Sequence, residues 1–385
     1  MAEPLPPLDL AEFARRLAAL QGGMSRARLD ALLLTAPADI AWISGLRTRF
    51  WQSPCRAWHV AVPQVGAPVA VIPDIGAAPM RQSWVTDIRS FPAPGADGVA
   101  ELAATLGAMA PETGAIGLPM GPGTALHMPL AAYRRLTEAV APRRLVDAGA
   151  LVSDARAVKS AAETARIRAA ARAAGAAFAR LPRLAAPGRT VAETGRAVEA
   201  AALMAGADWV GYCAAVAGPG GYPDVIAPGG DAPLAPGDVL IVDLGVVVEG
   251  YFCDFARNLA IGPPSAAARD GHAALHGAVA AGLAAARPGA TAADLHAAMA
   301  AALHAAGHRP AGGRFGHGIG LSLTEPPSLM PGDRTVLREG MVLALEPAIE
   351  LGPGRFMVAE ENVVLRESGA VLLTDPADAS LMVAG

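Results

Sequence analysis

Two segments of the chain carry acidic residues on strands that are otherwise apolar. The first, residues 238–254, reads DVLIVDLGVVVEGYFCD and holds Asp243 and Asp254 on the two sides of a Glu-Gly step. If that step is a two-residue hairpin loop, Val248 pairs with Tyr251. Side chains alternate along a strand, so the two aspartates then lie on one face as diagonal neighbours. This register predicts two carboxylates close together.

The second segment predicts a similar pair of acids. The strand MVLALE ends in Glu346, and the strand FMVAEENVVL returns after a Gly-Pro-Gly turn. With the loop centred on the Pro-Gly step, Glu346 pairs directly with Glu361, while Glu360 points to the other face. The sequence therefore predicts that Glu346 and Glu361 face each other.

A histidine between the hairpins completes a candidate metal site. His317 lies in the motif GHGIG, whose glycines allow close approach of backbone or substrate. A lone histidine is more often structural, and a single acid at a strand end is more often solvated. Two hairpins that each bring acids together nevertheless favour a cation, because unpartnered buried carboxylates are costly. One imidazole and four carboxylates suit two divalent ions of Mn, Co, Fe or Zn, which can activate a hydroxide and polarise a carbonyl.

These motifs resemble those of the pita-bread metallopeptidases, which include Xaa-Pro aminopeptidases, prolidases and methionine aminopeptidases, with creatinase as a metal-free relative. The similarity rests on the eleven-residue aspartate spacing, GHGIG, EGMVLALEP and EENVVL, and covers about residues 156–370. It implies a dinuclear hydrolase of the Xaa-Pro dipeptidase or aminopeptidase type, in which a metal-bound hydroxide attacks an amide carbonyl. The implied metal ligands are Asp243, Asp254, His317, Glu346 and Glu361. Asp254 and Glu361 would bridge the two ions.

Two histidines that the family's peptidases carry near the scissile bond are missing here. Thr324, followed by Glu325, stands where one is expected, and the other position falls near Ile226. Asp224 or Tyr222 could replace the second histidine. We therefore take Thr324, Glu325 and Asp224 as candidate catalytic residues and expect weak activity on ordinary Xaa-Pro dipeptides, since imidazole groups typically contribute about 10²–10⁴-fold.

The last glutamate motif also departs from the family pattern. An arginine is often found two residues before the final ligand, and Ala359 stands at that position if Glu361 is the ligand. Glu360 then takes the place of an apolar residue and is a further substitute for a missing histidine. These departures leave open a different activity on the same fold: a C–N hydrolase or lyase acting on a small non-peptide molecule such as creatine, ectoine or dimethylsulfoniopropionate. A catalytically silent binding module is disfavoured by the intact ligand set.

The elements that must position these residues fall into two domains. Residues 1–155 alternate between helix-like and strand-like pieces, beginning with a helix from Asp9 to Gln21, and predict an α/β domain similar to the creatinase-type N-terminal domain. Residues 156–385 begin helices at capping boxes such as Ser160-Ala-Ala-Glu163. Their strands follow these helices, which predicts an α+β domain with a curved antiparallel sheet covered by helices.

An aromatic and basic cluster follows the motif ISGL in the N-terminal domain. It contains Trp51 and Trp58 together with Arg47, Arg49 and Arg56. Such a cluster is typical of a packed loop. The resemblance also allows a substrate-binding loop contributed across a homodimer, with Trp51, Arg47 and Arg49 contacting substrate.

Composition excludes several other classes of protein. The 385 residues carry a net charge of −4, and the scattered arginines form no basic face for nucleic acid. No apolar run reaches the roughly 18–20 residues of a membrane span, and no secretory signal is visible. Three cysteines lie far apart and outside any CxxC pair, which is typical of reduced thiols. We expect a cytoplasmic homodimer that acts on a small peptide or small molecule.

Overall fold

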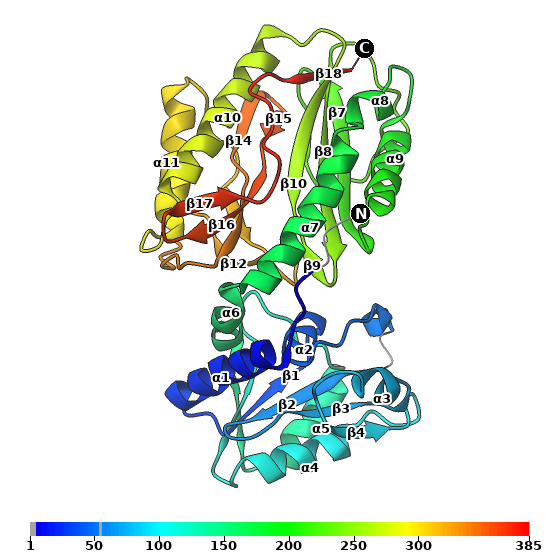
Figure 1. Ribbon diagram of the computed structural model, residues 1–385, viewed down its shortest axis with the longest axis vertical. Helices are drawn as coiled ribbons and strands as arrows, with labels where there is room; N and C mark the ends of the chain where they lie inside the picture. Colours follow the sequence, from blue (N-terminus) through cyan, green and yellow to red (C-terminus); the bar gives the residue numbers. More distant parts are fainter. Residues whose placement is uncertain (1–4, 54–55, 385) are drawn as a thin grey trace. The chain divides into compact units, whose positions relative to one another are not determined.

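The computed structural model describes residues 5–53 and 56–384, and their contacts divide them into two compact units (Figure 1). Pro6–Arg156 forms the N-terminal unit. Residues 157–384, with Leu5, form the C-terminal unit. The division falls next to the boundary expected at residue 155.

A six-stranded mixed sheet forms the centre of the N-terminal unit, in the order β4-β3-β2-β1-β5-β6. Its strands are β1 (Ala31–Leu34), β2 (His59–Pro63), β3 (Val69–Pro73), β4 (Asp87–Phe91), β5 (Ala115–Leu118) and β6 (Arg144–Asp147). The helices are α1 (Leu10–Ala27), α2 (Pro37–Ser44), α3 (Asp74–Met80), α4 (Val99–Met109), α5 (Leu130–Val140) and α6 (Gly149–Ala157), with the 3-10 turn η1 (Phe50–Gln52). Apolar residues of α4 and α5 pack against the sheet. The predicted α/β fold of this unit is confirmed.

Helix α1 begins where the sequence predicts and ends later. Asp9 caps the helix, because its Oδ1 accepts a hydrogen bond from the backbone N–H of Glu12 at 2.9 Å. The predicted end at Gln21 is wrong, since the helix continues through the next two glycines. At Gly23 an added Cβ would lie 2.9 Å from Cγ of Leu151. That glycine is used for close packing, so it does not stop the helix.

The C-terminal unit contains two larger sheets and one small hairpin. One sheet has the order β18-β10-β8-β7 with β9 paired to β8, the other has the order β12-β11-β13-β16-β17, and β14 pairs with β15. The strands are β7 (Trp209–Pro219), β8 (Asp238–Val248), β9 (Tyr251–Phe252), β10 (Phe255–Ile261), β11 (Gly316–Gly318), β12 (Glu325–Ser328), β13 (Val342–Leu345), β14 (Ala348–Gly352), β15 (Arg355–Val358), β16 (Glu361–Arg366), β17 (Gly369–Leu372) and β18 (Met382–Ala384).

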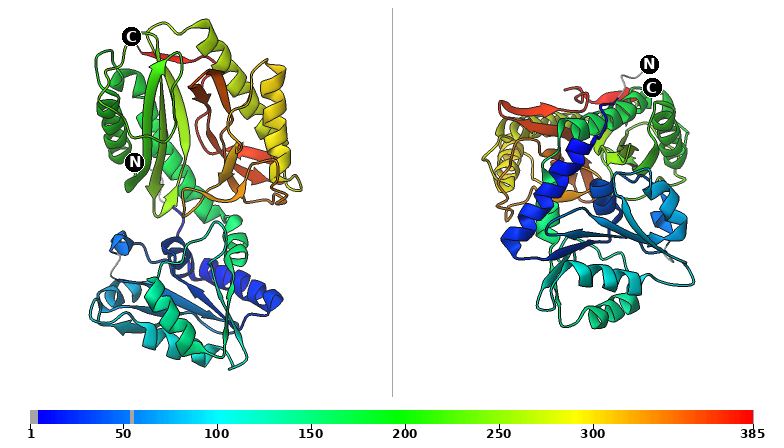
Figure 2. Two further views of the ribbon diagram at one scale, coloured as in Figure 1. Left: turned by 180° about the vertical axis from the view of Figure 1, so that it is seen from behind. Right: turned by 60° about the horizontal axis from the view of Figure 1, so that its bottom comes forward.

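Two groups of helices cover these sheets, one group for each half of the unit. They are α7 (Ala161–Phe178), α8 (Leu181–Leu184), α9 (Val191–Met204), α10 (Ala266–Ala285) and α11 (Ala292–Ala305). Helices α7 and α9 pack on the apolar face of β8, and α10 and α11 pack on the sheet that contains β13 (Figure 2). The predicted α+β arrangement is confirmed.

Capping boxes start three of these helices, as the sequence predicts. Both reciprocal hydrogen bonds of the box form at each start. The three pairs are Ser160 with Glu163, Thr190 with Glu193, and Thr291 with Asp294. The side chain and the backbone N–H groups satisfy one another, which fixes where each helix begins.

The first hairpin has the predicted register. Val248 pairs with Tyr251 across a loop of Glu249 and Gly250, and Asp243 pairs with Ala256. Both loop residues have positive φ, 49° and 88°, as a tight hairpin turn requires. Regular pairing on both sides of the loop therefore brings Asp243 and Asp254 to one face.

The second hairpin differs from its prediction by one residue. The turn is as expected, because Gly352 pairs with Arg355 across the Pro-Gly step. A β-bulge then shifts the register between Glu350 and Gly352, leaving Leu351 as the extra residue. Strands β13 and β16 consequently pair Leu345, not Glu346, with Glu361. A shift of one residue exchanges the two faces of a strand, so the predicted facing of Glu346 and Glu361 is wrong.

The remaining features of the described chain carry little chemistry. Cys213 and Cys253 are free thiols, and Cys253 packs in the core, while Cys55 lies outside the described residues. Among the described helices, none has both the length and the apolar character that crossing a membrane requires.

Candidate metal centre

Five side chains from the two sheets converge in the C-terminal unit. Asp243 lies within β8 and Asp254 immediately precedes β10. His317 is the central residue of β11, Glu346 follows β13, and Glu360 precedes β16. Asp254, Glu346 and Glu360 therefore stand next to the end of a strand, whereas Asp243 lies in the middle of one. Four of these residues belong to the set implied by the sequence, and Glu360 replaces the fifth.

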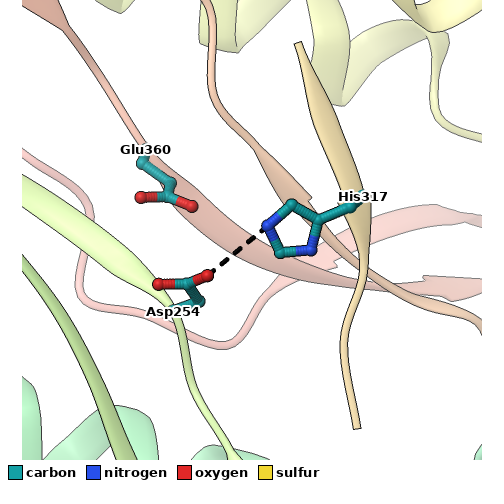
Figure 3. Close-up of side chains that lie close together, drawn as sticks. All are labelled: Asp254, His317 and Glu360. Atoms are coloured by element: carbon teal, nitrogen blue, oxygen red, sulfur yellow. Dashed lines mark ion pairs between the residues drawn. The ribbon is translucent and has the colours of Figure 1, made fainter. Parts of the chain in front are cut away.

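Three of them lie closest together (Figure 3). Ligand atoms of Asp254, His317 and Glu360 all fall within 4.8 Å of one another. His317 Nε2 lies 3.4 Å from Asp254 Oδ2 and 3.8 Å from Glu346 Oε1. The charges of Asp254 and His317 both act on Asp243, and those of Asp243 and Asp254 act on Glu360. The cluster thus runs from Asp243, through Asp254 and Glu360, to the imidazole and Glu346.

The backbone fixes the orientation of His317. Its Nδ1 lies 2.8 Å from the carbonyl oxygen of Gly318, so Nδ1 donates a proton there and Nε2 is left to face the acids. The flanking glycines serve the neighbouring strands. A Cβ on Gly316 would lie 2.1 Å from the carbonyl oxygen of Ala344, and one on Gly318 would lie 2.3 Å from that of Pro326. The glycines let β11 lie tightly between β12 and β13.

The site is too acidic to be stable as a cluster of free carboxylates. Burial and the Asp254 carboxylate raise the pKa of Asp243 to about 8. Burial also raises the pKa of Asp254 and of Glu346, each to about 7, and burial with the nearby aspartates raises the pKa of Glu360 well above its usual range. Burial lowers the pKa of His317, which favours the neutral imidazole that binds metal.

Several buried oxygen atoms of the cluster have no hydrogen-bond partner among the described residues. They are Asp243 Oδ1, Asp254 Oδ1 and Glu346 Oε1. Unsatisfied buried carboxylate oxygens are costly, and a divalent cation satisfies them while cancelling the repulsion that raises these pKa values. The donor set therefore fits one or more divalent metal ions.

Glu361 lies outside this cluster. Its Oε2 accepts a hydrogen bond from Arg257 Nη2 at 3.1 Å and another from the Thr374 hydroxyl, and its Oε1 accepts one from Ala377 N at 2.8 Å. Arg257 also donates to the carbonyl oxygen of Glu360 at 3.2 Å. Arg257 therefore binds the carboxylate of Glu361 and the backbone carbonyl of Glu360, and the side chain of Glu360 points toward the other acids.

Sequence reasoning missed a second residue that joins the hairpins. The side chain of Asn362 is hydrogen-bonded to both backbone groups of Asp254: its Oδ1 accepts from the N–H at 2.9 Å, and its Nδ2 donates to the carbonyl oxygen. Asn362 is fully buried. A buried asparagine next to an acid pair is the signal that could have identified this bridge.

The three candidate catalytic residues lie in different surroundings. Glu325 is buried and forms an ion pair with Lys159 Nζ at 3.0 Å, and it also accepts from Ser322 N at 3.1 Å. Thr324 is exposed. Asp224 caps a turn, where its Oδ1 accepts from two backbone N–H groups at 2.8 Å each. The Asp224 carboxylate is thus used locally, and its catalytic role stays a prediction.

Tyr222 and Ile226, the other positions considered for the missing histidines, differ in their burial. Tyr222 is fully buried, and its hydroxyl lies 3.1 Å from Asn258 Oδ1. Ile226 is 77% exposed. If Glu360 is the last acid of the centre, the residue before it is the apolar Ala359, which agrees with the family pattern. Val358 then stands two residues before that acid, where the family often has an arginine.

The aromatic and basic cluster lies in the N-terminal unit. Trp51 and Trp58 pack edge to face with ring centroids 5.0 Å apart, and Arg47 and Arg49 are exposed. The packed-loop interpretation accounts for the two tryptophans. A role for Trp51, Arg47 and Arg49 in binding substrate stays a prediction.

Arg314 is a functional candidate that sequence reasoning did not identify. Its Nη2 lies 3.3 Å from Glu346 Oε1, and its side chain is 41% exposed. It also lies close enough to oppose the protonation of Asp254 and of His317. A cation three residues before a candidate ligand histidine was the available signal.

The fold and this donor set define a metal-dependent hydrolase. Residues 165–367 match metallopeptidase family M24, and residues 16–158 match the creatinase/prolidase N-terminal domain. The chain belongs to metallopeptidase family M24 and has the pita-bread fold of that family, so the resemblance inferred from the motifs is confirmed.

Particular relatives cover nearly the whole chain. It is 32% identical over 376 residues to the probable dipeptidase PepE of Mycobacterium bovis, covering 94% of each chain. The crystal structure of dipeptidase PepE from Mycobacterium ulcerans is 31% identical, has a TM-score of 0.85 and is matched over 98% of this chain and 99% of that one. A prolidase from Thermococcus sibiricus, 20% identical, shares the fold with a TM-score of 0.87 over 98% and 100% of the two chains. These relatives support peptide-bond hydrolysis rather than a non-peptide reaction.

Proposed function

We propose that this chain is a dinuclear metal-dependent dipeptidase. The observation that carries the proposal is the convergence of Asp243, Asp254, Glu346 and Glu360 on His317, with three buried carboxylate oxygens left unsatisfied among the described residues. Four carboxylates balance the charge of two divalent ions, and the full-length likeness to a probable dipeptidase supports a short peptide as substrate.

The contacts support a division of the ligands between the two ions. Asp243 would help to hold one ion together with Asp254, whose charge acts on it. His317 and Glu346 would hold the other ion, since His317 Nε2 lies 3.8 Å from Glu346 Oε1. Asp254 and Glu360 would offer ligand atoms to both ions, because both lie within 4.8 Å of the His317 ligand atom and act on the charge of Asp243. In this proposal Glu360 would take the role that the family resemblance implied for Glu361.

The chain's own residues prepare the site for hydrolysis. Two bound divalent ions would supply a hydroxide nucleophile and polarise the amide carbonyl. His317 is held by Gly318 so that its Nε2 faces the centre. The Asn362 bridge keeps Asp254 in register with Glu360 across the two sheets. Each of these hydrogen bonds orients a ligand residue through an atom that does not face the metal centre. Such contacts tune the affinity of a metal site.

Glu325 acts in this proposal as an anchor. Lys159 and Glu325 are both buried and paired at 3.0 Å, and an ion-paired carboxylate accepts hydrogen bonds and has no proton to give. The pair fixes the end of the loop that carries Thr324. The Thr324 hydroxyl can donate a hydrogen bond to the departing amine but carries no positive charge near neutral pH, so we expect slow cleavage of ordinary Xaa-Pro dipeptides.

A metal and substrate panel tests this function. Protein loaded with Mn, Co or Zn is assayed on Ala-Ala, Ala-Pro and Xaa-Pro-Xaa peptides, beside Thr324→His. We expect dipeptide hydrolysis that depends on metal, with a rise in kcat/KM on Ala-Pro in Thr324→His. A protein that binds no divalent ion after reconstitution, or that cleaves no dipeptide when loaded, contradicts the proposal.

We further propose that the enzyme works in the cytoplasm as a homodimer, with manganese among the metals it accepts. The scattered reduced thiols support a reducing compartment. Sedimentation at micromolar concentration tests the dimer, and a fully active monomer would contradict it.

A further inference from the structure

Among the described residues, Arg314 combines three properties next to the metal centre. It is cationic, its side chain is 41% exposed, and its Nη2 lies 3.3 Å from Glu346 Oε1. Asp254, His317 and Glu360 are buried, whereas Asp243 is half-buried and Glu346 has 21% of its side chain exposed. One partly exposed edge of the centre therefore lies beside Arg314, at Glu346.

Among the described residues, the guanidinium of Arg314 forms the ion pair with Glu346 and donates no hydrogen bond. Glu346 Oε1 accepts no hydrogen bond from any described residue, so the contact with Arg314 is an ion pair without hydrogen-bond geometry. Gly312 and Gly313 precede the arginine, and a Cβ on either would meet no atom within 4 Å. The five N–H donors of an arginine thus stand in an uncrowded segment at the edge of the site.

Charge arithmetic shows what these donors would bind. The four carboxylates of the centre carry four negative charges, which two divalent ions cancel, and His317 is neutral. Loading the site in that way leaves the positive charge of Arg314 without a compensating anion. An arginine fork matches a carboxylate with two parallel hydrogen bonds.

We propose that Arg314 binds the free α-carboxylate of a dipeptide and so restricts the enzyme to dipeptides. This inference rests on the proposed dipeptidase function. In a dipeptide the carboxylate is two bonds from the scissile nitrogen, so its partner must lie within a few ångströms of the metal ligands, as Arg314 does. Each added residue moves the carboxylate away by about 3.3–3.6 Å, beyond the reach of the same contact.

The test compares substrates that differ only in this charge. Metal-loaded wild type, Arg314→Gln and Arg314→Lys are assayed on Ala-Ala, its C-terminal amide and Ala-Ala-Ala. Arg196→Gln, an exposed arginine on α9, is the matched control. We expect kcat/KM for Ala-Ala to fall about 10- to 100-fold in Arg314→Gln, mostly through KM, the size of a lost charge-assisted hydrogen bond. Hydrolysis of the amide should change less than about 3-fold, and Arg314→Lys should lie between.

Two further readouts separate this role from an effect on the metals. Bound metal per chain should be the same in wild type and Arg314→Gln. Calorimetric titration should show that L-alanine binds more tightly than L-alaninamide to the wild type, and that Arg314→Gln removes this difference. Equal losses on Ala-Ala and its amide, or no loss on either, overturn the assignment while leaving the dipeptidase function intact. A wild type that cleaves none of the peptides overturns the dipeptidase function and, with it, this assignment.

Discussion

The two acid-bearing hairpins of the C-terminal unit are built alike and differ by one residue. In the first, the register at the Glu249-Gly250 loop is the same as the register at Asp243, although the ladder breaks at Cys253 and Asp254 between β9 and β10. In the second, the turn is as tight, but Leu351 bulges out of β14 and moves the following pairs by one position. The comparison teaches that turn chemistry sets the register of a hairpin only as far as the first bulge.

The bulge has a visible packing reason. A Cβ on Gly271 of α10 would lie 2.8 Å from Cδ2 of Leu351, so the leucine side chain lies directly on the glycine of the helix. Beyond the bulge, polar contacts between the two sheets fix which glutamate faces the acids. Arg257 donates a hydrogen bond to Glu361, and Asn362 accepts one from the backbone of Asp254. Packing on one side and paired polar groups on the other thus select Glu360 for the centre.

The largest expected effect compares one ligand from each hairpin. Asp254→Asn should lose both ions and lower kcat/KM by more than about 10³-fold, because Asp254 stands between them and its hydrogen-bonded backbone anchors both sheets. Glu346→Gln should keep one ion, since Glu346 lies at the exposed edge. Metal content by atomic absorption beside kcat/KM checks this. Equal metal loss in the two variants would contradict the bridging role of Asp254.

A second prediction concerns the stability of the second hairpin. Glu361→Leu leaves Arg257, which is 6% exposed, without its carboxylate partner. We expect a loss of about 3–5 kcal/mol in the free energy of unfolding, the usual result of removing one member of a buried pair. Urea denaturation measures it. A loss below about 1 kcal/mol would mean that Glu361 is not the partner that fixes this strand.

The bridge between the hairpins gives a smaller, specific effect. Asn362→Ala removes both hydrogen bonds to the Asp254 backbone. We expect metal affinity to fall about 10- to 100-fold, as for other groups that orient a ligand from behind. Competition with a chelator measures the affinity. Unchanged affinity would show that the two sheets hold Asp254 without this asparagine.

The smallest expected effect is on the bulge itself. Deletion of Leu351 should lower Tm by a few degrees, because it removes apolar contact with α10, a cost of about 1–2 kcal/mol. The metal content should not change, since the pairs beyond the bulge are held by buried residues of β13 and β16. If Glu361→Gln lost metal when it was combined with the deletion of Leu351, the bulge alone would determine which of the two glutamates binds metal.

Much of this unit could be predicted from residues alone. Capping boxes at Ser160, Thr190 and Thr291 fixed helix starts, and the Glu-Gly loop fixed the first register, because these signals act within a few residues. Glu360 could not be chosen over Glu361 in this way, because the choice depends on a bulge that packs on a distant helix and on Arg257 from another strand. Arg314 was missed because its spacing from His317 is a weak signal, and its contact with Glu346 is visible only in the fold.

The central claim is that Glu360, and not its neighbour, completes the metal centre. The most direct measurement is the number of ions bound by purified Glu360→Gln and Glu361→Gln, reconstituted with manganese and counted per chain beside the wild type. Both changes are isosteric, and both residues are 3% exposed, so they form a matched pair. The account predicts that Glu360→Gln loses at least one ion while Glu361→Gln keeps the wild-type number. Loss of metal in Glu361→Gln, with full occupancy in Glu360→Gln, would contradict it.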